Sequence, residues 1–117
     1  MKTIILDTDF IINVVKNHIE LEAQIKSLFP YKVEISYLDR TNDELKNKPF
    51  EDLARDILKN FKMITTTRDK TVDELILDIS KNKKELIVAT QDRKLKEKLK
   101  KGKIQVITIR QQKYITL

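Results

Sequence analysis

The chain has 117 residues, of which 40% are hydrophobic and 36% are charged, which predicts one domain (residues 1–117) with a buried core and a densely charged surface. One glycine and two prolines are too few turn residues for a hairpin-rich sandwich or barrel, and the lack of cysteine excludes disulfides and thiolate metal sites. The net charge of +6 favours polyanionic partners such as nucleic acid.

The first half of the chain predicts two short strands and four helices. Thr3–Leu6 is typical of a buried strand, and residues 7–9 cap an apolar helix over Phe10–Val15. The apolar spacing then predicts, in order, a helix from Ile19 to Phe29 ended by Pro30, a strand over Lys32–Ser36, a helix over Tyr37–Asn47, and a helix over Phe50–Phe61 that follows Pro49.

The second half of the chain predicts a regular alternation of strands and helices. A strand over Met63–Ile64 precedes Thr71, which forms a capping box with Glu74 and predicts a helix to Ile79. After a turn at residues 83–85, the remaining elements are a strand over Leu86–Ala89, a helix over Arg93–Lys101 capped by residues 90–92, a left-handed helix end at Gly102, a strand over Ile104–Ile109, and a short edge strand over Tyr114–Leu117.

This order of elements predicts an α/β fold. Strands that alternate with helices form a mostly parallel sheet with helices on both faces. We therefore expect a three-layer α/β/α sandwich with a central sheet of four to five strands.

The sequence also predicts where the protein resides. The apolar stretch after Lys2 is short and is broken by Asp7 and Asp9, so we expect no signal peptide. No apolar run approaches the length of a membrane span. Together with the absence of cysteine, this predicts a cytoplasmic protein that does not associate with membranes.

Three aspartates lie at positions where a parallel sheet would gather them. Asp7 and Asp92 follow the first and fourth predicted strands, and Asp73 opens the helix before the fourth strand. Each has an alternative interpretation as a helix-end residue, which stabilises a helix by about 1 kcal/mol. Their convergence at one sheet edge instead favours an oxygen-ligand site for Mg²⁺ or Mn²⁺, with one or two ions that support phosphodiester hydrolysis.

Several segments resemble the PIN-domain ribonucleases. They are Leu6–Phe10, Asp43–Leu45, Val72–Leu75 and Val88–Leu95. The final stretch, Ile104–Arg110 with Tyr114, is similar to the subgroup that includes the small-subunit ribosomal RNA processing nucleases and their archaeal relatives. The resemblance implies a PIN-like fold and a metal-dependent endoribonuclease that acts on single-stranded RNA, with a role in ribosomal RNA processing.

The resemblance also implies roles for individual residues. Asp7, Asp73 and Asp92 match the first, third and fourth acids of the family, and Glu44 matches the second. Asp39 and Asp43 compete with Glu44 because they lie on the same predicted helix. Asp9 is an expected accessory metal ligand, and the hydroxyl residues Thr8 and Thr90 are expected to bind RNA beside the metal.

The helix after Asp92 is strongly basic. A lysine-rich helix is often a solvated surface, but this one begins beside the proposed site, where cations would hold phosphates. We expect RNA contacts from four of the basic residues: Arg93, Lys94, Lys96 and Arg110.

Other functions are compatible with the same residues. One is a catalytically silent PIN-like module that binds RNA or a protein, and another is a toxin ribonuclease of a toxin–antitoxin pair. A phosphoacceptor receiver domain is disfavoured, because Thr65–Thr67 and Arg110 occupy positions where it requires Asp and Lys. The expected partners are RNA, a second copy of the chain, and either an antitoxin or a ribosome-assembly factor.

Overall fold

The computed structural model describes residues 1–83 and 85–117, so the predicted turn at residues 83–85 lies partly outside the described residues. The helices are α1 (Thr8–Lys16), α2 (Leu21–Leu28), α3 (Arg40–Leu45), α4 (Glu51–Leu58), α5 (Val72–Ser80) and α6 (Arg93–Lys101). The strands are β1 (Lys2–Leu6), β2 (Val33–Leu38), β3 (Lys62–Ile64), β4 (Leu86–Ala89), β5 (Gln105–Arg110) and β6 (Tyr114–Thr116). None of the described helices combines the length and apolar character needed to cross a bilayer.

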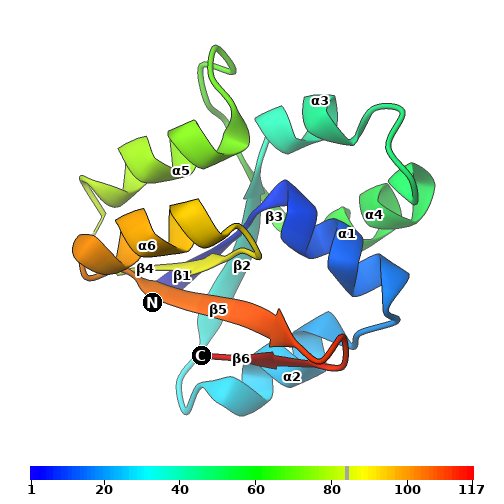
Figure 1. Cartoon of the computed structure of the whole chain (residues 1–117), viewed down its shortest axis with the longest axis horizontal. Helices are drawn as coiled ribbons and strands as arrows, with labels where there is room; N and C mark the ends of the chain where they lie inside the picture. The colour runs from blue at the N-terminus through cyan, green and yellow to red at the C-terminus, as the bar shows by residue number, and fades with distance from the viewer. Residues whose placement is uncertain (84) are drawn as a thin grey trace.

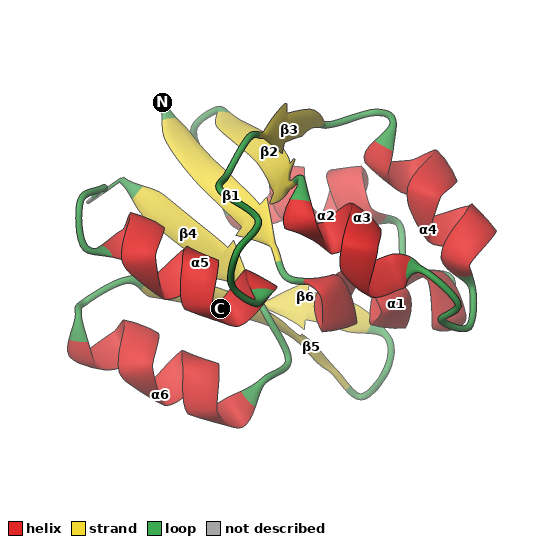
Figure 2. Ribbon diagram, turned by 90° about the horizontal axis from the view of Figure 1, so that it is seen from above, coloured by secondary structure: helices red, strands yellow, loops and turns green. Residues whose placement is uncertain are grey.

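The strands form one sheet in the order β3-β2-β1-β4-β5-β6, with helices on both faces (Figures 1 and 2). Neighbours from β3 to β5 are parallel, and β6 is antiparallel to β5. Helices α5 and α6 cover one face, and α1 to α4 cover the other. The predicted α/β class with a mostly parallel sheet is confirmed. The sheet has six strands instead of four to five because the short segments β3 and β6 both pair at its edges.

The core lies on both sides of the sheet because successive strand residues point to opposite faces. In β1, Ile4 and Leu6 pack toward α1 to α4, whereas Ile5 packs toward α5 and α6. In β4, Ile87 and Val88 divide in the same way. All of these side chains are at most 1% exposed, which explains why the central strands are continuous apolar runs.

The edge at β6 is closed by a side chain of α2. Gln24 accepts a hydrogen bond from the Ile115 N–H at 2.6 Å and donates one to the Lys113 carbonyl at 3.2 Å. The amide therefore replaces a further strand along part of β6, which protects this edge from pairing with another chain.

Four predicted helix starts differ from the structure: the predictions were Phe10, Ile19, Tyr37 and Phe50, and the helices begin at Thr8, Leu21, Arg40 and Glu51. Tyr37 and Leu38 belong to β2, where they pair with residues of β3, and the Asp39 N–H donates to the Ile64 carbonyl at 2.9 Å. Tertiary pairing with β1 and β3 overrides the local helical pattern, so α3 begins only at Arg40. The next helix begins after Phe50, which is left-handed (φ 65°) and 43% exposed.

The end of α6 also differs from the prediction. Gly102 has φ −83°, and the left-handed residue is Lys103, with φ 62°. The Lys103 N–H donates to the Lys100 carbonyl and the Ile104 N–H to the Leu99 carbonyl, the two bonds of a Schellman motif. The glycine therefore lies one residue before the position that requires left-handed backbone.

Replacing Lys103 with Gly is expected to stabilise the protein by roughly 0.5–1 kcal/mol, because glycine adopts positive φ without a Cβ clash. The measurement is the midpoint of urea unfolding, with Gly102→Ala as the control. A Cβ at position 102 meets the Leu99 carbonyl oxygen at 3.5 Å, an ordinary contact, so Gly102→Ala is not expected to be strained. An unchanged or lower midpoint for Lys103→Gly would contradict the assignment.

Candidate active site

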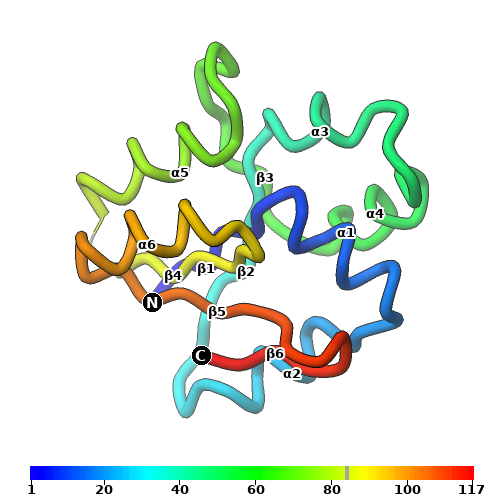
Figure 3. The backbone as a smooth tube through the Cα atoms, in the orientation of Figure 1, coloured from blue at the N-terminus to red at the C-terminus, as the bar shows by residue number. Residues whose placement is uncertain are grey.

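The order of connections places the ends of β1 and β4 side by side. From β1 the chain moves outward through β2 to β3, and then returns across the sheet to β4 on the other side of β1 (Figure 3). In parallel sheets such a reversal opens a crevice at the carboxyl ends of the two central strands, where ligands bind. Asp7 follows β1 here and its N–H donates to the Ala89 carbonyl of β4 at 2.9 Å.

Asp7 is a buried acid at this reversal. Only 5% of it is exposed, and its carboxylate accepts the Thr8 N–H at 2.9 Å and the Thr90 hydroxyl at 2.7 Å. The pKa of Asp7 is raised to about 6, chiefly by burial and then by the charges of Asp9 and Asp73, whereas the hydrogen bonds from Thr90 and Thr8 act in the opposite direction. Asp9 of α1 and Asp73 of α5 are thus both close enough to Asp7 to repel its carboxylate, as in a site built for a cation.

Thr90 connects Asp7 with Asp92. Its hydroxyl is fully buried, donates to Asp7, and accepts the Asp92 N–H at 3.1 Å. Asp92 in turn caps α6, because one of its oxygens accepts the Leu95 N–H at 2.9 Å. Asp92 is therefore a helix cap, and it is also held within two hydrogen bonds of Asp7.

Glu44 is joined to two elements of the site. One oxygen accepts the Thr8 hydroxyl at 2.8 Å, and the other accepts the Val72 N–H at 3.0 Å. Thr8 follows Asp7 and Val72 precedes Asp73, so Glu44 of α3 links the segments that carry both aspartates. Thr8 and Thr90 are at most 5% exposed, and their hydroxyls donate to carboxylates of the site.

The two competitors of Glu44 are engaged elsewhere. Asp39 is buried and accepts hydrogen bonds from the hydroxyl and the N–H of Thr66. Burial by itself would raise the pKa of Asp39, but these hydrogen bonds outweigh it, so the pKa is lowered. Asp43 is exposed and pairs with Arg68 and Arg40. The structure therefore brings Glu44, and neither competitor, to the segments around Asp7.

The site offers oxygen donors to a metal. Asp73 is half-buried in the first turn of α5, and Asp9 is exposed in the first turn of α1. As the described side chains stand, no three His, Cys, Asp or Glu groups are close enough to hold a metal ion. The donor chemistry nevertheless fits Mg²⁺ or Mn²⁺, because the groups around Asp7 are carboxylates whose mutual repulsion a divalent cation would relieve.

The predicted cations lie on two elements near Asp92. Arg93 and Lys94 are exposed in the first turn of α6, and Arg110 is exposed at the end of β5. Lys96 is half-buried and donates to the Thr108 hydroxyl at 2.8 Å.

Sequence reasoning missed the role of Gln91, which accepts the Thr108 hydroxyl and the Ile109 N–H. Gln91 also donates to the Ile109 carbonyl, so it ties the loop after β4 to β5. No local signal in the sequence indicates this role.

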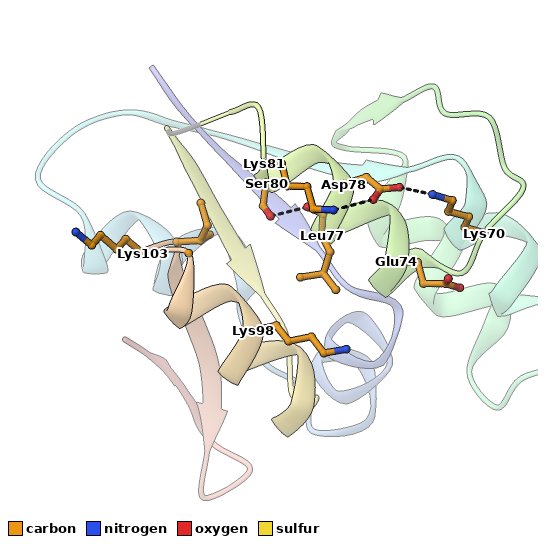
Figure 4. Close-up of a pocket in the computed structure, with 10 residues that line it drawn as sticks. Lys70, Glu74, Leu77, Asp78, Ser80, Lys81, Lys98 and Lys103 are labelled. Atoms are coloured by element: carbon orange, nitrogen blue, oxygen red, sulfur yellow. Dashed lines mark hydrogen bonds and ion pairs between the residues drawn. The ribbon is translucent and has the colours of Figure 1, made fainter.

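A hollow of about 830 Å³ lies apart from these acids, between α5 and α6 (Figure 4). Its acids already have partners. Asp78 pairs with Lys70 and Lys81, and Glu74 accepts the Thr71 N–H in the predicted capping box. The pKa of Asp78 is lowered, first by the hydrogen bond from Lys70. These paired charges do not form a second carboxylate centre.

Comparison with known proteins agrees with this geometry. The family model described as PIN like domain matches residues 3–112. Ribonuclease VapC4 of Methanocaldococcus jannaschii is 35% identical over 128 residues, an alignment that covers 100% of this chain and 97% of that protein. The solved structure of the PIN domain endonuclease Utp24 has a TM-score of 0.79 with 23% identity, and the match covers 97% of this chain and 88% of that one. The likeness to Utp24 shows the fold.

Proposed function

The chain belongs to the PIN-like domain family, and from this premise we propose that it is a metal-dependent endoribonuclease. Its proposed reaction is hydrolysis of phosphodiester bonds in single-stranded RNA by one PIN-like domain over residues 1–117. The identity with a curated ribonuclease over the whole chain supports an RNA substrate.

One observation carries the proposal. A buried acid, Asp7, has a pKa raised to about 6 by burial and then by the charges of Asp9 and Asp73. Hydrogen bonds through Thr90 and Thr8 connect it to Asp92 and Glu44. A buried carboxylate repelled by other acids is unfavourable for folding on its own, and a cation that the reaction needs would relieve this cost.

The residues divide into holding and positioning roles. Asp7, Asp73 and Asp92 would hold Mg²⁺ or Mn²⁺, with Asp9 as an outer ligand. The bound ion would lower the pKa of a water molecule and neutralise charge on the phosphate. Thr90 and Thr8 orient the carboxylates of Asp7 and Glu44.

Exposed cations would bring the substrate to these acids. Arg93 and Lys94 follow Asp92 directly on the first turn of α6, and both are exposed. They would bind RNA phosphates near the acids, an interaction that does not depend on base sequence.

The proposal is tested by incubating the protein with labelled single-stranded and duplex RNA. We expect internal cleavage of the single strand in the presence of Mn²⁺ or Mg²⁺, and loss of cleavage when EDTA removes the ion. The control is an Asp92→Asn variant, which is expected to give no products. If the wild type also gives no metal-dependent products, the chain is a catalytically silent RNA-binding or protein-binding module instead.

Glu44 and Asp43 provide a matched pair on one helix. We expect Glu44→Gln to lower kcat/KM roughly 10–100-fold, the usual loss when a group that orients metal ligands is removed. Asp43 is exposed and paired with arginines, so Asp43→Asn is expected to change kcat/KM by less than about threefold. The reverse ranking would make Asp43 the second acid of the site.

Two cellular roles are compatible with the proposed nuclease activity. The similarity of the last strand to ribosomal RNA processing nucleases supports ribosomal RNA, with a ribosome-assembly factor as partner. The identity with Ribonuclease VapC4 supports a ribonuclease, and the second candidate is a toxin ribonuclease that acts with an antitoxin. The role with an antitoxin predicts that a neighbouring gene encodes a small protein. That protein should co-purify with this chain and inhibit cleavage. A cytoplasmic location and a homodimer stay predictions.

A further inference from the structure

The basic residues of α6 face two different surroundings. Lys98 lies toward the hollow between α5 and α6, which also contains the acids Glu74 and Asp78 (Figure 4). In that hollow Asp78 forms ion pairs with Lys70 and Lys81. Lys96 lies instead toward β5, where it donates to Thr108.

Three cations gather on the β5 side, and we name them the β5 cation cluster: Lys96, Lys100 and Arg110. Lys100 lies one turn after Lys96 on α6. Arg110 lies two residues after Thr108 on β5, so both side chains leave the same face of the strand. The bond between Lys96 and Thr108 therefore brings the helix cations to Arg110.

The cluster lacks internal neutralisation. Within residues 1–83 and 85–117, no ion pair includes Lys96, Lys100 or Arg110. Burial lowers the pKa of Lys96, and the charges of Lys100 and Arg110 lower it further, whereas Asp92 acts in the opposite direction. Like charges held together in this way favour an anion bound from outside.

The arrangement around Lys96 is prepared for such an anion. Thr108 accepts one N–H of the ammonium and itself donates to Gln91, so Lys96 is held in place with two donors left. Lys100 and Arg110 are exposed, and the charges of both act on Lys96. The oxygens of a phosphate can accept charge-assisted hydrogen bonds from these donors.

We infer that the β5 cation cluster is a phosphate subsite of the RNA-binding surface, and that it holds a backbone phosphate next to the one being cleaved. The inference rests on the proposed function for its ligand. Its position follows from α6, because Lys96 lies one turn after Asp92 and is within reach of the charge of Asp92. The RNA strand would then run from the acids across the carboxyl end of β5.

The test measures RNA binding in an Asp7→Asn background, so that cleavage does not interfere. The cluster variant is Lys100→Gln with Arg110→Gln, since both residues are exposed. The charge-matched control is Lys26→Gln with Lys32→Gln. Both lysines are exposed, Lys26 on α2 and Lys32 just before the amino end of β2, whereas the acids follow the carboxyl ends of the strands. We expect the cluster variant to weaken binding about tenfold, the value of one charge-assisted contact, and the control to change it less than about twofold.

A chemical change in the RNA locates the contact. A methylphosphonate removes the charge of one linkage, and a series places it at each linkage around the cleavage site. We expect one linkage whose neutralisation weakens binding about tenfold in the parent protein and less than about twofold in the cluster variant, because the two changes remove the same contact.

Two outcomes would overturn the subsite. One is a cluster variant that binds RNA as the control does. The other is a series in which every linkage affects the parent and the cluster variant equally. Because binding is measured without cleavage, a protein that binds in the expected pattern but cuts no RNA would refute the nuclease function alone.

Discussion

Replacing Asp7 with Asn is expected to lower kcat/KM for cleavage of single-stranded RNA by roughly 10³-fold, equivalent to about 4 kcal/mol of transition-state stabilisation. Asparagine keeps the shape of the side chain and can still bond Thr8 or Thr90, so the effect isolates the negative charge. The measurement is the initial rate of cleavage at saturating Mn²⁺ over a range of RNA concentrations.

The control for this result is Asp52→Asn. Asp52 is an exposed acid in the first turn of α4, on a helix that carries none of the proposed site residues. Its replacement removes the same charge and is expected to leave the rate within about twofold, as for most surface substitutions. A rate for Asp7→Asn within tenfold of the wild type would remove Asp7 from the reaction.

The same substitution is expected to stabilise the metal-free protein at neutral pH by about 2–3 kcal/mol. The pKa of Asp7 is raised from 3.8 to about 6 in the folded state, so ionisation opposes folding. Each pKa unit corresponds to about 1.4 kcal/mol, and Asn carries no charge to bury. The measurement is the free energy of urea unfolding in EDTA for both proteins.

The pH dependence has a defined direction. Below about pH 4 Asp7 is protonated in both the folded and the unfolded wild type, and its contribution to stability is fully present. As pH rises toward 6 the unfolded state ionises first, and the wild type loses this contribution. The difference between Asn variant and wild type should therefore grow from pH 4 to pH 6 and then stay constant. If the difference in stability between the Asn variant and the wild type is the same at pH 4 and at pH 7, the pKa of Asp7 is not raised.

Added Mn²⁺ separates a metal site from a merely unfavourable charge. An ion that binds only the folded state stabilises it by mass action. We expect Mn²⁺ to raise the unfolding midpoint of the wild type and to change that of Asp7→Asn little. The two Asp7 predictions together describe an acid that destabilises the metal-free fold and is needed for the reaction.

The proposed site could be read from the sequence only where the acids follow strong local patterns. Asp7 and Asp92 come after apolar strands, and the capping box of Thr71 and Glu74 locates Asp73 at a helix start. Glu44 came from resemblance, because three acids lie in the predicted helix over Tyr37–Asn47 and local sequence does not distinguish them. Their contacts do so: Glu44 meets Thr8 and Val72, whereas Asp43 meets Arg68.

The errors in the helix boundaries have the same origin. Tyr37 and Leu38 fit a helical pattern locally, but pairing with β1 and β3 makes them strand residues. Lys103 adopts the left-handed conformation expected of Gly102, because the hydrogen bonds of the helix end select the position and not the residue type.

The sequence by itself determined the alternation of strands and helices, the parallel character of the sheet and the strand-end positions of Asp7 and Asp92, since each depends on neighbouring residues and their periodicity. Only the tertiary structure decided which strands are adjacent. The placement of β4 beside β1 brings Thr90 to Asp7, and that of β5 beside β4 brings Arg110 toward Lys96. These contacts join residues far apart in the chain, and they depend on packing of the whole sheet, which no local pattern encodes.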